Sequence, residues 1–209
     1  MRTDYVKSIY HQLKVVLALR ISMRLVVTAA LLISTFYITD ADSGQEAFDE
    51  YKVKAAFLLN FINFIEWPEE VLVQSGPDFN IAILGEDPFG SAINTITGKP
   101  AKGRTIKIKK IAGLQYIEEL KKCHIVFVSS SQSEILSEII EALQDYNVLI
   151  VGDTEGFAHM GCMINFTIAE KKVRFEVNIG AADRAGLKIS SKLLKLATIV
   201  AEEPRVEGD

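Results

Sequence analysis

Few side chains in this sequence have the types and spacing that catalysis or metal binding requires. Beyond residue 41, histidine occurs only at His124 and His159, and neither belongs to a His-x-x-x-His or Cys-x-x-Cys motif. No Gly-x-Ser-x-Gly elbow surrounds Ser129–Ser131, and helix capping explains these serines. The sequence therefore predicts no catalytic residue, no metal site and no cofactor, and a hydrolase is the least favoured function.

Two glycine-containing segments are the candidates for ligand binding. Residues 85–90 follow an apolar run and open a helix, which is where doubly wound sheets bind anions, but Glu86 and Asp87 would repel a phosphate. Asp153 ends another apolar run and precedes the glycine-rich segment 156–161, which contains His159. Asp153 is either a ligand or partner contact or an ordinary turn residue, whereas His124, at the start of a buried run, is predicted to be a packed or capping histidine.

Cys123 and Cys162 are the two cysteines, and each immediately precedes an apolar run typical of a strand. They could lie at the same end of neighbouring strands and form a disulfide in an oxidising compartment. They could equally be two buried thiols that never meet, and both interpretations stay open here.

The N-terminus has the pattern of a secretory signal. Residues 25–38 are uncharged, follow Arg20 and Arg24, and are too few for a comfortable membrane span. We expect a signal peptide over residues 1–41, with translation starting at Met1 or Met23 and cleavage after Ala41, and hence a periplasmic protein. An uncleaved anchor is the alternative.

The exported protein would be acidic. Export removes five of the 23 basic and two of the 27 acidic residues, which leaves 18 and 25 and a formal charge of −7. Nucleic-acid binding requires a basic footprint, and the one basic cluster, residues 99–110, alternates like a solvated edge strand. Nucleic acid is therefore not expected as a partner.

One predicted helix, from Tyr51 to about Ile65, is apolar on nearly every side and stops at Trp67-Pro68. Either the fold or a partner must bury it. We assign the helix body to the core and the exposed end, Glu66-Trp67-Pro68, to a partner.

Apolar runs alternate with helical patterns along the rest of the chain, which favours a parallel sheet. Two period-2 segments then flank Lys171-Lys172, and a last helix is expected over residues 191–201. The predicted fold is α/β: a single domain with a mixed, mostly parallel sheet, flanked by helices and carrying a C-terminal antiparallel hairpin. The predicted boundaries are a flexible N-terminus at 42–50, the α/β domain at 51–201 and a disordered tail at 202–209.

Six blocks in order resemble the YfiR family of bacterial periplasmic proteins. They are YKVKAAFLLNFINFIEWP, FNIAILGEDPFG, GKPAKGRTIKIKKI, CHIVFVSSS, VLIVGDTEGFAHMGCMINFTIAEKKVRFEVNI and AADRAGLKISSKLLKLA, spread over residues 51–200. The resemblance implies a non-enzymatic, dimer-forming regulator that binds and inhibits the periplasmic domain of an inner-membrane diguanylate cyclase, YfiN, and so modulates cyclic-di-GMP signalling and biofilm formation. The best-studied type has four cysteines in two disulfides; Cys123 matches a family cysteine, whereas Cys162 stands where other members have glycine or cysteine.

The predicted partner-binding residues come from the end of the first helix and from the segment after Asp153. They are Glu66, Trp67, Pro68, Asp153, Glu155, Phe157 and His159. The alternative function is a periplasmic small-molecule sensor whose pocket is formed by the glycine-rich segment and the strand ends.

Overall fold

The computed structural model describes residues 41–201. The predicted tail and all but the last residue of the predicted signal peptide lie outside these residues. The chain divides into two units, residues 1–47 and 48–209. Of the first unit only residues 41–47 are described, and they are helical. The second unit contains the α/β domain, which confirms the predicted fold class.

Helix α2 (Ala41–Phe64) is the apolar helix expected from the sequence, but it begins at Ala41 and not at Tyr51. The rings of Phe57 and Phe61 lie 5.4 and 5.5 Å from the ring of Phe175, and both also approach Phe166. Each buried aromatic side chain removes about 150–250 Å² from water. The fold therefore buries the body of this helix, as predicted.

An eight-stranded sheet forms the centre of the domain, with the order β10-β8-β7-β6-β5-β2-β4-β3. Its strands are β2 (Asp78–Leu84), β3 (Pro100–Ala101), β4 (Arg104–Ile111), β5 (Ile125–Val128), β6 (Leu149–Gly152), β7 (Ile164–Ala169), β8 (Lys172–Asn178) and β10 (Thr198–Val200). The pairs β4–β2, β2–β5, β5–β6, β6–β7 and β8–β10 are parallel, whereas β3–β4 and β7–β8 are antiparallel. The sheet is thus mixed and mostly parallel, as predicted.

The order of the strands creates a topological switch point. The chain leaves β2 to form β4 on one side and then returns to form β5 on the other side of β2. In doubly wound sheets, ligands bind at such a point, outside the carboxyl ends of the strands. We call the end of the sheet where β2, β5 and β6 finish the carboxyl edge, and the end where they begin the amino edge.

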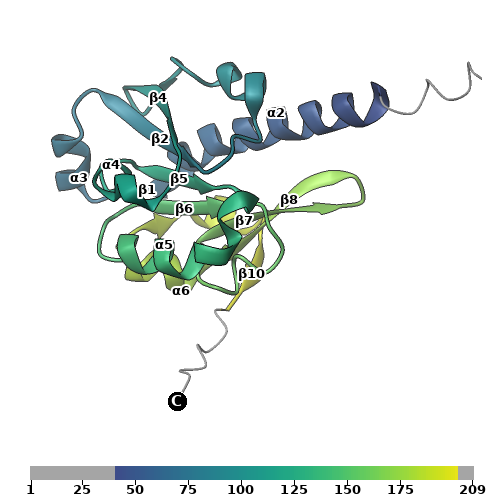
Figure 1. Cartoon of the computed structure of the whole chain (residues 1–209). Helices are drawn as coiled ribbons and strands as arrows, with labels where there is room; N and C mark the ends of the chain where they lie inside the picture. The colour runs from purple at the N-terminus through teal and green to yellow at the C-terminus, as the bar shows by residue number, and fades with distance from the viewer. Residues whose placement is uncertain (1–40, 202–209) are drawn as a thin grey trace, which may run out of the picture. The chain divides into compact units, whose positions relative to one another are not determined.

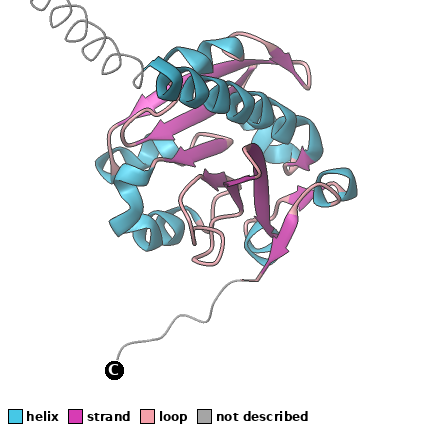
Figure 2. Ribbon diagram, turned by 90° about the vertical axis from the view of Figure 1, so that its right-hand side faces the viewer, coloured by secondary structure: helices cyan, strands magenta, loops and turns pink. Residues whose placement is uncertain are grey.

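Short helices connect the strands. They are α3 (Glu69–Gln74), α4 (Ile117–Leu120), α5 (Leu136–Leu143), α6 (Ile179–Arg184), α7 (Ser191–Leu194) and the 3-10 helices at Gly90–Thr95, Leu114–Tyr116 and Ser130–Ile135. All four residues of β5 and of β6 are buried, so both faces of the central sheet are covered. Figures 1 and 2 place α2 and α5 on opposite sides of these strands. A two-stranded sheet joins β1 (Ile65–Glu66) to β9 (Lys188–Ile189).

The predicted C-terminal hairpin is present, but its turn differs from the expected one. β7 and β8 pair from Ile164↔Val177 to Ala169↔Lys172. The two turn residues are Glu170 and Lys171, with φ of 52° and 58°, instead of Lys171 and Lys172. A two-residue turn with positive φ at both positions matches the right-handed twist of the flanking strands.

The predicted final helix over residues 191–201 is wrong beyond its first turn. α7 ends at Leu194, and Thr198–Val200 form β10, which pairs with β8. Three successive β-branched residues favour an extended conformation, and the free edge of β8 offers them hydrogen-bond partners.

Gly85 tests how tightly the switch point is packed. It has a φ of +93°, and a Cβ there would lie 2.4 Å from Ser131 Oγ. Gly98, at φ +77°, has no atom within 4 Å of such a Cβ. Gly98→Ala should therefore cost only the conformational penalty, about 1 kcal/mol, whereas Gly85→Ala should cost about 2–3 kcal/mol of unfolding free energy. Urea denaturation of both variants measures this, and equal costs would contradict close packing at the switch point.

Candidate functional site

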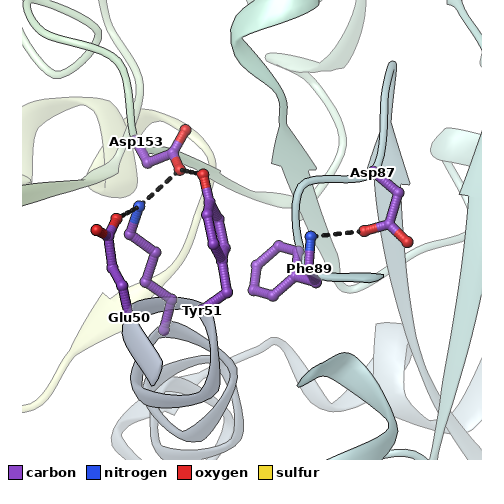
Figure 3. A network of polar contacts seen from close by, with 6 residues as sticks. Glu50, Tyr51, Asp87, Phe89 and Asp153 are labelled. Carbon is purple, nitrogen blue, oxygen red and sulfur yellow. Dashed lines mark hydrogen bonds and ion pairs between the residues drawn. The ribbon is translucent and has the colours of Figure 1, made fainter. Parts of the chain in front are cut away.

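Asp153, the candidate residue after β6, lies in a buried polar cluster at the carboxyl edge. Its Oδ2 is 2.8 Å from Lys54 Nζ and accepts a hydrogen bond of 2.9 Å from the Tyr51 hydroxyl. Lys54 Nζ also lies 2.6 Å from Glu50 Oε1, one helical turn earlier. Figure 3 shows Glu50 and Tyr51 on α2 beside Asp153. The carboxylate of Asp153 therefore holds α2 against the end of β6.

This cluster is shielded from water. The side chains of Lys54 and Asp153 are only 4% and 6% exposed. Burial, followed by the charge of Asp153, raises the pKa of Tyr51 well above its usual range, so the phenol keeps its proton and remains a donor. The ammonium of Lys54 lies 4.3 Å from the centre of the Tyr51 ring, which adds a cation–π contact.

The switch point between β2 and β5 is filled by the protein's own residues. The backbone N–H of Glu86 donates to Ser131 Oγ at 2.9 Å, which joins the loops that follow the two strands. Asp87 Oδ1 accepts from Phe89 N at 2.8 Å, and the Phe89 ring lies between those of Tyr51 and Phe127, at 5.2 and 4.8 Å. Ligand binding in this crevice would have to displace these groups.

The segment after Asp153 contains both buried core residues and exposed surface residues. Phe157 is 2% exposed, and its ring fills the space where Gly152 has no side chain. The ring of Phe157, one of the predicted partner residues, is therefore packed against the end of β6 and is not exposed. Glu155 is exposed, and His159 Nδ1–H donates to the carbonyl of Ala201 at 3.2 Å.

Trp67 was predicted to be exposed, and it is not. It is 6% exposed and makes edge-to-face contacts with Phe79 at 5.0 Å and with His124 at 6.3 Å. Lys102, whose Nζ donates to the carbonyl of Ile65 at 2.6 Å, lies over the Trp67 ring at 5.7 Å. The helix ends at Phe64, β1 follows it, and the indole of Trp67 then enters the core at the amino edge. Glu66 remains exposed and Pro68 partly so.

His124 is a packed histidine, as predicted, with both ring nitrogens engaged. Its Nδ1 accepts from the backbone N–H of Asn80 at 3.1 Å, so the proton is on Nε2, 2.9 Å from Ser75 Oγ. The hydroxyl of Ser75 in turn donates to the carbonyl of Leu72 at 3.1 Å. Burial and the nearby charge of Arg104 lower the pKa of His124 to about 4, so the ring is neutral at pH 7.

Of the two interpretations of Cys123 and Cys162, the structure has the second: no disulfide is formed, and both thiols are free and buried. The cysteines do precede β5 and β7 at the same edge, but β6 lies between those strands. Two strand spacings place the backbones about 10 Å apart, beyond the roughly 7 Å that a disulfide tolerates. Burial raises the pKa of Cys123 to about 11 and that of Cys162 further still.

The seven predicted partner residues therefore do not form one surface. Trp67 and Phe157 are in the core, Asp153 holds α2, and the four others lie in separate places. Glu66 and Pro68 are at the amino edge, Glu155 follows the end of β6, and His159 lies beside the end of β10. Sequence reasoning missed Tyr51 and Lys54. A signal was available, because Lys54 is the only charge between Val53 and Ile65, and a charge on a buried helix face requires a partner.

Within residues 41–201, no three or more His, Cys, Asp and Glu side chains gather in a way that could hold a metal ion. None of the helices in this part of the chain is both long and apolar enough to span a bilayer.

Comparison with known proteins identifies a family whose model matches most of this chain. A family model described as YfiR/HmsC-like matches residues 51–198. Among solved structures, the chain is similar to a conserved domain protein from Vibrio cholerae O1 biovar El Tor strain N16961, with 10% identity and a TM-score of 0.45 over 63% of this chain and 58% of that one. It is also similar to an ABC domain in complex with L-Trp from Streptococcus pneumonia, with 11% identity and a TM-score of 0.44 over 58% and 55%. The chain thus spans less than two thirds of either protein.

The Lys54–Asp153 pair should matter far more to stability than an exposed pair. Lys54→Met leaves a buried carboxylate without its cation and should cost about 3 kcal/mol of unfolding free energy. Lys110→Met is the matched control, because Lys110 pairs with Asp87 at 2.6 Å but is 60% exposed; it should cost less than about 1 kcal/mol. The double variant Lys54→Met/Asp153→Leu should recover most of the loss. Equal costs for the two single variants in urea denaturation would contradict the anchoring role of Asp153.

His124 should make stability depend on pH. The pKa of His124 is lowered to about 4 in the folded state, whereas in the unfolded chain it is about 6.5. Below pH of about 6.5, the unfolded chain therefore binds a proton on this ring that the folded protein does not yet bind. The stabilisation from the neutral ring is thus complete above pH of about 6.5 and is lost as the pH falls toward 4. We expect the unfolding free energy of His124→Gln to fall less steeply over this range than that of the unmodified protein. Parallel slopes in urea titrations from pH 7 to 4 would count against this assignment.

Proposed function

The chain belongs to the YfiR/HmsC-like family, and from this premise we propose that it is a periplasmic regulatory protein acting through protein–protein contact. It binds and inhibits the periplasmic domain of an inner-membrane signalling protein, a diguanylate cyclase of the YfiN type, and so modulates cyclic-di-GMP signalling. Export with a cleaved signal peptide, homodimer formation and the absence of catalysis are parts of the same proposal.

This proposal rests on the observation that the polar groups at the carboxyl edge are already bound to other residues of the domain. At this edge, where α/β sheets hold substrates and cofactors, Asp153 is bound by Lys54 and Tyr51. The Ser131 hydroxyl accepts a hydrogen bond from the backbone N–H of Glu86, in the loop that follows β2. With these polar groups engaged inside the domain, the side chains left for recognition at this edge are those on its outer surface.

An exposed apolar patch lies beside the predicted Glu155 and His159. Met160 is 43% exposed and Ile199, on β10, is 50% exposed. The hydrogen bond from His159 to Ala201 joins the segment after β6 to the end of β10. We define the partner surface as Glu155, His159, Met160 and Ile199. Its apolar side chains flanked by polar ones fit the composition of a protein–protein contact.

Glu66 and Pro68 are retained as a separate proposed contact at the amino edge. The alternative function, a small-molecule sensor with its pocket at the glycine-rich segment, finds less support, because Phe157 and Ala158 of that segment are buried in the core.

The partner surface can be tested with the purified periplasmic domain of a diguanylate cyclase from the same organism. Met160→Asp places a charge on the surface and should weaken binding to this domain, and inhibition of the full-length cyclase, about tenfold or more. Ile168→Asp is the matched control, because Ile168 is 52% exposed on the β7–β8 hairpin, outside the surface. It should leave both unchanged.

Binding that Met160→Asp and Ile168→Asp weaken equally would disprove the surface assignment. If no such periplasmic domain binds the unmodified protein, the cyclase is the wrong partner.

A further inference from the structure

A cavity of about 540 Å³ opens at the amino edge of the sheet, at the opposite end from the closed carboxyl edge. Its walls come from α3 and from the starts of β2, β5 and β6, and the end of β4 contributes one side chain, that of Lys109. This volume lies within the range of pockets that hold small molecules. The cavity lies apart from the partner surface, so the inference drawn from it is independent of the proposed function.

The lining of this cavity is basic, although the chain as a whole carries a net charge of −4. Lys109, Lys121 and Lys122 line it, and Asp145 is the one acidic residue among the lining side chains. Neighbouring ammonium groups on the walls of a concave site raise the local concentration of anions. The positive charge of the cavity lining therefore favours an anionic ligand.

Two of the three lysines are available to such a ligand. Lys121 is already paired with Glu118 at 2.7 Å and lies 4.7 Å from the centre of the Tyr146 ring. The ammonium groups of Lys109 and Lys122 form no hydrogen bond or ion pair with any other residue between 41 and 201. Two ammonium groups that line the cavity are thus outside the ion pairs of this part of the chain.

Several neutral polar groups also line the cavity, beside the apolar side chains of Val71 and Val148. The His124 ring accepts the Asn80 N–H at Nδ1 and keeps its Nε2 proton directed at Ser75. The side-chain amides of Gln74 and Asn80 also line the cavity and can donate N–H groups. No carboxylate on this part of the wall would repel an anion.

We propose that this cavity binds a small molecule through a phosphate group. Lysine ammonium groups act as point charges that suit a tetrahedral, multiply charged phosphate, whereas the planar fork that pairs with a carboxylate belongs to arginine. The lining contains lysines and no arginine. Lys109 and Lys122 bind the phosphate oxygens, and the amides of Gln74 and Asn80 complete the contacts.

Inorganic pyrophosphate is the probe, titrated into the whole protein by calorimetry at constant ionic strength. Lys109→Gln/Lys122→Gln should lower its affinity about tenfold or more, because two charge-assisted contacts are lost. Lys99→Gln/Lys107→Gln removes the same charge from exposed positions outside the cavity and should leave the affinity unchanged. Citrate serves as a second titrant and should bind the unmodified protein more weakly than pyrophosphate.

A second pair of variants blocks the cavity without changing its charge. Val71→Trp fills the space from α3, whereas Val73→Trp places the same ring on the 71% exposed face of the same helix. Pyrophosphate binding should be lost in the first and kept in the second.

Three results would overturn the proposal: no heat with the unmodified protein, an equal loss of affinity in the two lysine double variants, or full binding by folded Val71→Trp. Tighter binding of citrate than of pyrophosphate would overturn the choice of phosphate.

Discussion

The buried ammonium of Lys54 is the constraint on which much of this structure depends. A charge that is 96% removed from water is tolerated only when it is paired and hydrogen-bonded, and α2 brings Lys54 to the end of β6, where Asp153 meets it. Tyr51, one turn away on the same helix face, adds its hydroxyl to the same carboxylate oxygen. The position of α2 along the sheet is therefore set by polar contacts that can be satisfied in one register, while the Phe57–Phe61 packing supplies the apolar burial.

This anchoring has different consequences at the two edges of the sheet. At the carboxyl edge, the paired Asp153 and the joined loops of the switch point close the site that this topology offers to ligands. At the amino edge, the chain leaves α2 after Phe64, and the indole of Trp67 enters the core beside His124. The chain then forms α3 as the wall of a basic cavity. A fold that commonly binds ligands at one end thus has a basic cavity at the other.

Sequence patterns predicted the fold wherever local propensity and tertiary packing agreed. The alternation of Ile106, Lys107, Ile108 and Lys109 identified β4 as a half-exposed strand, and the continuous apolar runs identified β2, β5 and β6. The final helix was wrong because Leu193–Ala197 continue a helical pattern, whereas Thr198–Val200 find an open strand edge at β8. The candidate site was predicted only in part: Asp153 was identified, but its partners on α2 lie about a hundred residues away in the chain.

The family, the fold class and the buried character of α2 could be predicted from the sequence, because motif order and hydrophobic periodicity are local properties of the chain. Only the tertiary structure decided that Trp67 and Phe157 are core residues and that Asp153 is an anchor. It also decided that β6 separates Cys123 from Cys162. Each of these facts depends on which segments become neighbours when the strands assemble. Strand order and helix register arise from long-range contacts, and no short stretch of sequence records them.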